Sequence, residues 1–135
     1  ISRLFNAVGA PVLSDEHPLL RPSAGGGFTV YGSPWPSSGH FALNGSAPLR
    51  RIYFLEHGAA NVIEPLTPQG ALKRFIECAM IPWMDPAFFD PFIRPIENIL
   101  RAVPAAVLRF VPDEAVVPFV KADLAAAAHP RMAGP

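Results

Sequence analysis

The sequence has few charged residues, a single cysteine and no long apolar run. Only 16% of the 135 residues are Asp, Glu, Lys or Arg, and the formal net charge is zero. A neutral chain has no long-range attraction for nucleic acid or for an anionic membrane, so we expect neither as a partner. Cys78 has no second cysteine for an internal disulfide, which favours a reducing, cytoplasmic compartment. No apolar stretch reaches the roughly 20 residues that a membrane-spanning helix requires.

The chain also lacks an initiator methionine, because it begins Ile1-Ser2-Arg3-Leu4. This start predicts that residues 1–124 form a single, truncated domain, followed by a flexible tail at 125–135. Half of the residues are hydrophobic, which is a globular composition. The 17 prolines are spread along the chain and predict short elements joined by rigid turns.

Lysine is rare as well. The two lysines, Lys73 and Lys121, follow a leucine and a valine. A phosphate loop of the Gly-Lys-Ser/Thr type needs a lysine directly after glycine, so this chain contains no such loop. The three glycines at 25–27 stand between two predicted strands and precede no helix, so we interpret them as a hairpin turn.

Apolar and β-branched runs predict strands in the first half of the chain and again near residue 106. The longest run has the apolar centre Ile52–Leu55 without polar alternation, which predicts the central strand of a sheet covered on both faces. The predicted strands and extended segments are 11–14, 19–21, 28–31, 49–56, 62–66 and 106–111.

The second half has helical periodicity. Thr67 and Pro68 provide the N-cap and first residue of one helix, and Asp85 and Pro86 those of the next. The apolar stripe of the second helix continues through two interior prolines, so we expect one bent helix there. A last helix follows residues 112–114. The expected fold class is therefore α/β: a mixed sheet with hairpins in the first half, packed by about three helices in the second half.

Two adjacent carboxylates and a histidine follow the short apolar run at Val12 and Leu13. If that run is a strand, Asp15, Glu16 and His17 lie at the edge of a sheet, where open α/β sheets bind their ligands. Adjacent acids in this position hold a divalent metal and orient a nucleophile in nucleotide-using enzymes. The alternative is a solvated turn, because short acidic motifs also occur by chance.

A long loop at 32–48 is the second candidate region. Trp35 stands between two prolines and could line a binding pocket, although a packing role fits equally. His40 and, after the loop, Arg50 could contact a substrate, and an ordinary surface histidine is the alternative for His40. We therefore treat Trp35, His40 and Arg50 as a candidate substrate-binding set.

The order of these features resembles one protein family. The bacterial serine-kinase-like proteins related to HPr kinase/phosphorylase, which share the nucleotide-binding core of phosphoenolpyruvate carboxykinase, have a similar series in their carboxyl-terminal half. The resemblance covers roughly residues 8–121 and implies a partial core of that kind. The similar segments are Leu-Ser-Asp-Glu, Tyr-Gly-Ser-Pro-Trp-Pro, Ala-Pro-Leu-Arg-Arg-Ile-Tyr-Phe-Leu, Leu-Arg-Phe and Pro-Asp-Glu.

The resemblance implies Mg²⁺ and ATP as cofactors, with Asp15 and Glu16 as catalytic and metal-binding residues. Two alignments of the acids remain open. In one, Asp15 and Glu16 match the paired Asp-Asp of the HPr kinases, with Glu16 longer by one methylene. In the other, Asp15-Glu16-His17 matches the Asp-Glu-His of the carboxykinases, Ser14 replaces an acid, and Asp15 is the metal ligand.

The expected function is a part of an ATP-dependent kinase-like protein that transfers phosphate to a serine hydroxyl or a carboxylate of a protein or peptide. Because the phosphate loop is missing, we expect this chain alone to be inactive. A non-catalytic interaction module or a pseudokinase remnant is the alternative, in which the Trp35 loop and the Phe-rich helix contact a partner. A carboxykinase-type lyase would require a set of metal-binding His and Lys that the chain lacks. A homo-oligomer is left open.

Overall fold

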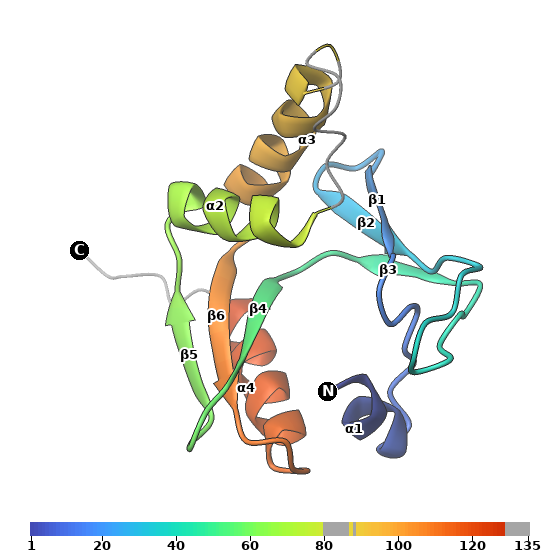
Figure 1. The fold of residues 1–135 in the computed structure, drawn as a ribbon, viewed down its shortest axis with the longest axis vertical. Coiled ribbons are helices and arrows are strands. Elements are labelled where there is room, and N and C mark those ends of the chain that lie inside the picture. The colour runs from blue at the N-terminus through green and yellow to red at the C-terminus, as the bar shows by residue number, and fades with distance from the viewer. Residues whose placement is uncertain (80–86, 88, 129–135) are drawn as a thin grey trace.

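The computed structural model describes residues 1–79, 87 and 89–128 (Figure 1). It contains two three-stranded sheets together with helices, which confirms the α/β fold class. The elements in chain order are α1 Ser2–Ala7, β1 Leu19–Pro22, β2 Phe28–Tyr31, β3 Ser46–Pro48, β4 Ile52–His57, β5 Val62–Pro65, α2 Pro68–Cys78, α3 Phe89–Ala102, β6 Ala105–Phe110 and α4 Val116–Ala128.

The first sheet has the order β1-β2-β3 and is antiparallel throughout. Its β1–β2 hairpin confirms the predicted pairing of 19–21 with 28–31. The turn between the strands contains Gly26 and Gly27 at φ 91° and 74°, a conformation that residues with a Cβ rarely adopt. The glycine run is therefore a hairpin turn, as its position between two strands predicted.

The second sheet has the order β4-β6-β5, with β6 parallel to β4 and antiparallel to β5. The sheet is mixed, as predicted, but its central strand is β6 and not Ile52–Leu55, and the hairpin strands form a separate sheet. Five of the six residues of β6 are buried; Ala105 packs on the α2 and α3 side, and Leu108 and Phe110 pack on the α4 side. In β4, Leu55 is 49% exposed at the sheet edge.

Helices cover both faces of this second sheet (Figure 1). On one face, Ile52 and Phe54 pack against a cluster that includes Ala71 of α2 and Ile96 and Leu100 of α3. On the other face, residues of β6 pack against α4, with α1 alongside; the buried members of this cluster are Leu108, Phe110, Val116, Val117 and Val120. The alternation of side chains along β4 and β6 distributes them between the two clusters.

The three predicted helices of the second half are present. The Oγ1 of Thr67 accepts a 3.2 Å hydrogen bond from the backbone N–H of Gly70, so the predicted N-cap of α2 is confirmed. Helix α3 runs through Pro95 without interruption, which confirms a single helix there, and its bend stays a prediction. The predicted start at Asp85 and Pro86 lies outside the described residues. Helix α4 extends to Ala128, so the tail expected from residue 125 begins as helix.

Candidate functional site

The segment before the two acids is not the strand that the sequence predicted. Within residues 11–14, only Ser14 forms a β-bridge, to Ala42, and the N–H of Leu43 donates a 3.0 Å hydrogen bond to the carbonyl of Leu13. Pro11 has no N–H to donate, so the ladder cannot extend in that direction. The acids therefore follow an extended segment tied to the long loop, and not the end of a sheet strand.

Asp15 holds that long loop in place. Its Oδ1 accepts a 3.1 Å hydrogen bond from the N–H of Ser37, and its Oδ2 accepts one of 2.6 Å from the N–H of Gly39. Partial burial opposes ionisation, but these backbone N–H groups together hold the pKa of Asp15 below its usual value. A Cβ at position 39 would lie 2.8 Å from Asp15 Oδ2, so glycine permits the close approach. Both carboxylate oxygens of Asp15 are thus engaged by the loop.

Glu16 and His17 are exposed and line two adjacent cavities. The larger cavity, of about 900 Å³, lies between the first sheet and β4 with α2, and Arg51 and Arg74 also line it. Within the described residues, the Glu16 carboxylate has no hydrogen-bond or ion-pair partner. Of the two predicted acids, Glu16 is therefore the one whose carboxylate is available in a cavity.

Trp35 lines the smaller cavity, of about 370 Å³, together with Glu16 and His17. Its side chain is 65% exposed, so it is not a packing residue of the core. His40 has a positive φ of 59° and is exposed, and Arg50 is exposed as well. Neither His40 nor Arg50 lines these two cavities. The structure thus brings Trp35 to the predicted acids and leaves the other two members of the candidate set elsewhere.

Arg51, which the sequence did not single out, borders the larger cavity. Its Nε lies 2.8 Å from Asp123 Oδ2, but the N–H does not point along that line, so the contact is ionic. The guanidinium lies over the Tyr53 ring, 5.6 Å from its centroid. Burial, and then the hydrogen bond and negative charge of Asp123, raise the pKa of the Tyr53 hydroxyl. This group links β4 to α4.

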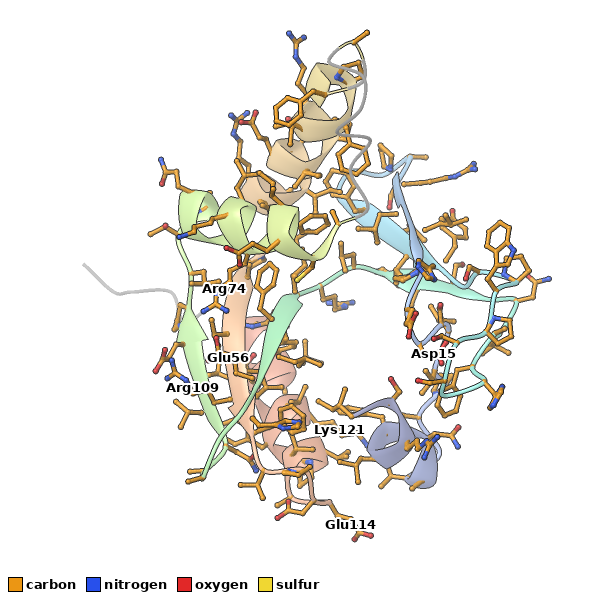
Figure 2. The ribbon with its side chains drawn as sticks, viewed as in Figure 1. Asp15, Glu56, Arg74, Arg109, Glu114 and Lys121 are labelled. Carbon is orange, nitrogen blue, oxygen red and sulfur yellow. The ribbon has the colours of Figure 1, made fainter. Side chains whose placement is uncertain are left out.

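A second charged cluster lies on the α2 side of the sheet (Figure 2). Glu56 accepts contacts from Arg74 at 2.7 Å and from Arg109 Nε at 3.1 Å, and Arg109 also pairs with Glu64. The bond to Arg74 is the main cause that lowers the pKa of Glu56, against partial burial. Every member has an opposite charge within reach, so the cluster joins α2 to the sheet and offers no unpaired group to a ligand.

The described residues do not fit ATP. Among the described residues, neither lysine lines the two cavities beside Glu16, so no ammonium group is placed there to bind phosphates. Over the same residues, no three His, Cys, Asp or Glu side chains gather into a metal site. Mg²⁺ needs only one or two protein carboxylates when phosphates and waters supply the rest, so Glu16 could be one ligand. The residues that the structure describes thus supply a carboxylate and no phosphate-binding group.

Comparisons with protein-family models, with curated proteins and with solved structures find no match for this chain. The resemblance to the HPr kinase family therefore stays a prediction from the sequence. None of the helices in the described part of the chain is long and apolar enough to cross a membrane.

Proposed function

We propose that this chain provides the acid-bearing part of a phosphoryl-transfer site in an ATP-dependent kinase-like protein. The acceptor in this proposal is a serine hydroxyl or a carboxylate of a protein or peptide, and the compartment is the cytoplasm. The observation that carries the proposal is the position of Glu16, whose carboxylate lines the cavity of about 900 Å³ and has no partner among the described residues. The ordered series of segments that resembles the HPr kinase family supports it independently.

The two acids have different roles in this proposal. Asp15 is a positioning residue, because both of its oxygens are used to hold the loop at residues 37–39. Glu16 can accept the proton of a serine hydroxyl that enters the cavity, which is the role of a general base. The paired-acid alignment, in which Asp15 and Glu16 act together on the substrate, is less compatible with this geometry. Because the chain offers no phosphate-binding loop, we derive no step that involves ATP itself.

The first test is the gene sequence on the amino-terminal side of Ile1. A Gly-Lys-Ser/Thr segment within a few tens of codons would supply the missing phosphate-binding part. In the encoded protein, we expect Glu16→Gln to lower phosphoryl transfer from Mg·ATP to a serine peptide by about 100-fold or more, the range for a general base. Glu77→Gln is the matched control, because Glu77 lines the same cavity from α2. Unchanged activity of Glu16→Gln would refute the role.

The exposure of Trp35 favours a second candidate function, a non-catalytic interaction module. A large aromatic side chain that is 65% exposed in a loop held by Asp15 is typical of a protein-binding surface. If the gene encodes no phosphate loop, this candidate takes precedence. Its signature would be a partner whose affinity falls at least tenfold in Trp35→Ala and is unchanged in Val62→Ala, a change at another exposed apolar residue, on β5.

A further inference from the structure

The free edge of β4 differs from every other edge strand that the structure describes. The sheet orders place β1, β3, β4 and β5 at edges. Strands β1, β3 and β5 each end in a proline and have four residues or fewer, whereas β4 has six residues and no proline. Proline and short length are the usual means by which proteins prevent an edge from pairing with another strand. This proline-rich chain blocks three edges and leaves β4 unblocked.

The hydrogen-bond pattern shows which groups of β4 face outward. The N–H of Ile52 donates to the carbonyl of Pro104, and that of Gly58 to the carbonyl of Phe110, both at 3.0 Å. In a parallel ladder, alternate residues bond to the same neighbour, so the even-numbered residues of β4 face β6. The N–H and C=O groups of Tyr53, Leu55 and His57 therefore point to the free edge. None of them has a backbone partner among the described residues.

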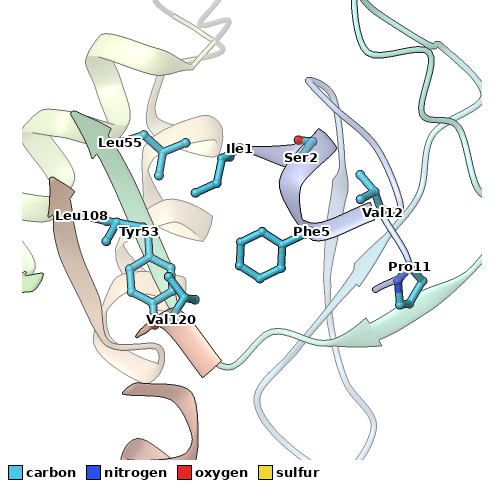
Figure 3. Close-up of a pocket in the computed structure, with 9 residues that line it drawn as sticks. All are labelled: Ile1, Ser2, Phe5, Pro11, Val12, Tyr53, Leu55, Leu108 and Val120. Atoms are coloured by element: carbon cyan, nitrogen blue, oxygen red, sulfur yellow. The ribbon is translucent and has the colours of Figure 1, made fainter. Parts of the chain in front are cut away.

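Cavities lie on both faces of the sheet at this edge. The cavity of about 900 Å³ adjoins Phe54 on the α2 side, and Leu20 and Val30 of the first sheet form its opposite wall. A cavity of about 330 Å³ lies on the α4 side, where Ile1 and Phe5 face β4 across the opening (Figure 3). Tyr53 and Leu55 line both cavities. The space beside β4 is therefore open and is flanked by largely apolar walls.

We propose that the free edge of β4 binds one extended peptide strand from a partner protein. Its backbone would bond to Tyr53, Leu55 and His57. Its side chains would alternate between the two cavities, because successive residues of a strand point to opposite faces. The smaller cavity has apolar walls that suit valine or isoleucine, and the larger one accepts aromatic side chains. A single strand suits this edge better than a second copy, since Phe5 of α1 faces β4 across the smaller cavity and another sheet would have to pass it.

The experiment uses the full chain and a synthetic peptide, acetyl-Val-Tyr-Val-Tyr-Val-amide, as probe. Amide hydrogen exchange is measured for β4, residue by residue. Without peptide, we expect the amides of Tyr53 and Leu55 to exchange at least about tenfold faster than those of Phe54 and Glu56, which face β6. Saturating peptide should slow the exchange of Tyr53 and Leu55 at least about tenfold. The same peptide methylated on every backbone nitrogen cannot donate backbone hydrogen bonds, and its methyl groups keep its carbonyls from approaching β4, so it should give no protection.

A pair of variants at one position supports the same test. Leu55→Pro removes an outward N–H and should abolish protection by the peptide, whereas Leu55→Thr keeps that N–H and should retain it. If Leu55→Pro fails to fold, the methylated peptide still decides the result. Equal protection by both peptides would overturn the proposal. So would slow exchange of Tyr53 and Leu55 that needs no peptide and grows with protein concentration, because a second copy would then occupy the edge. No nucleotide is present, so the outcome is independent of the proposed kinase function.

Discussion

The hydroxyl of Tyr53 donates a 2.5 Å hydrogen bond to Oδ2 of Asp123, which lies 70 residues later in the chain. Tyr53 is on β4 and Asp123 on α4, so the bond fixes the edge strand against the helix that covers one face of the sheet. The nearby Arg51 adds a positive charge to the same carboxylate. Strand β4, whose edge is unblocked, is thus held against α4 by this hydrogen bond as well as by apolar packing.

We expect Tyr53→Phe to lower the free energy of unfolding by about 1.5 kcal/mol, the lower end of the range for a hydrogen bond to a charged group. The lower end applies because Tyr53 and Asp123 are only partly buried. Tyr31→Phe is the control, since Tyr31 is exposed on the first sheet and should change stability little. Urea unfolding of the two variants measures the difference. An equal effect of both substitutions would show that the bond contributes nothing.

The same bond makes stability fall at alkaline pH. Burial and Asp123 raise the pKa of Tyr53 in the folded state, whereas an unfolded tyrosine ionises near 10. Above about pH 10 the unfolded chain therefore loses a proton that the folded chain retains, and unfolding becomes more favourable as pH rises. We expect the alkaline decline in melting temperature to be shallower in Tyr53→Phe than in Tyr31→Phe. Parallel declines would contradict the raised pKa.

Asp15 and Glu16 should differ in their effects on the loop. An amide in place of the Asp15 carboxylate loses the charge that both loop amides point to, so Asp15→Asn should speed hydrogen exchange at Ser37 and Gly39 by about tenfold or more. Glu16→Gln should leave both exchange rates unchanged. Because the pKa of Asp15 is lowered, the carboxylate stabilises the loop above its unfolded value near 3.9 and ceases to do so as pH falls through the folded pKa. Equal exchange rates at these two amides in the two variants would show that the charge of Asp15 does not hold the loop.

Local patterns in the sequence predicted the elements that depend on neighbouring residues. The Thr67 cap acts within a few residues of its own position, and the β1–β2 hairpin is set by the glycines between its strands. The order of strands in the second sheet was not predictable in this way. Strand β6 takes the central place through pairing with β4 and β5, which lie more than 40 residues earlier in the chain, and the pattern of Ile52–Leu55 looks just as buried in the sequence.

Only part of the candidate site was predicted, because some of its contacts also join residues that lie far apart in the sequence. The sequence placed Glu16 and Trp35 among the candidates, and the structure brings both to one cavity. The sequence could not show that both oxygens of Asp15 accept hydrogen bonds. Their donors are backbone N–H groups 22 and 24 residues away, and every residue except proline has such a group, so the pattern of side chains does not reveal them. Arg51 was missed because its partner, Asp123, lies on the last helix.

The position of β6 predicts where the core is most sensitive. Leu108 is 1% exposed in the middle of this strand, and Leu108→Ala should cost about 2–5 kcal/mol, the range for a buried leucine. Leu55→Ala removes the same atoms from the edge strand, where the side chain is 49% exposed, and should cost about 1 kcal/mol or less. Denaturant unfolding of both variants measures the contrast. A larger loss for Leu55 would show that the edge of β4 is covered in solution.

The charged cluster around Glu56 should contribute to the loss of stability in acid. Arg74, and then Arg109, lower the pKa of Glu56 against partial burial, so the folded state binds a proton at lower pH than the unfolded chain does. The stability that Glu56 contributes is therefore complete above the unfolded value near 4.3 and is lost as pH falls through the folded pKa. In Glu56→Gln this pH-dependent part is absent, while Arg74 and Arg109 lose the carboxylate that they share.

We expect Glu56→Gln to be less stable than the parent at pH 7 and to approach the stability of the parent near pH 3. Glu77→Gln, a change of the same chemistry at an exposed residue of α2, is the control and should differ little in stability from the parent at pH 7. Thermal melts of the three proteins from pH 3 to 7 measure this, and a constant difference between Glu56→Gln and the parent would show that the carboxylate acts through packing and not through its charge.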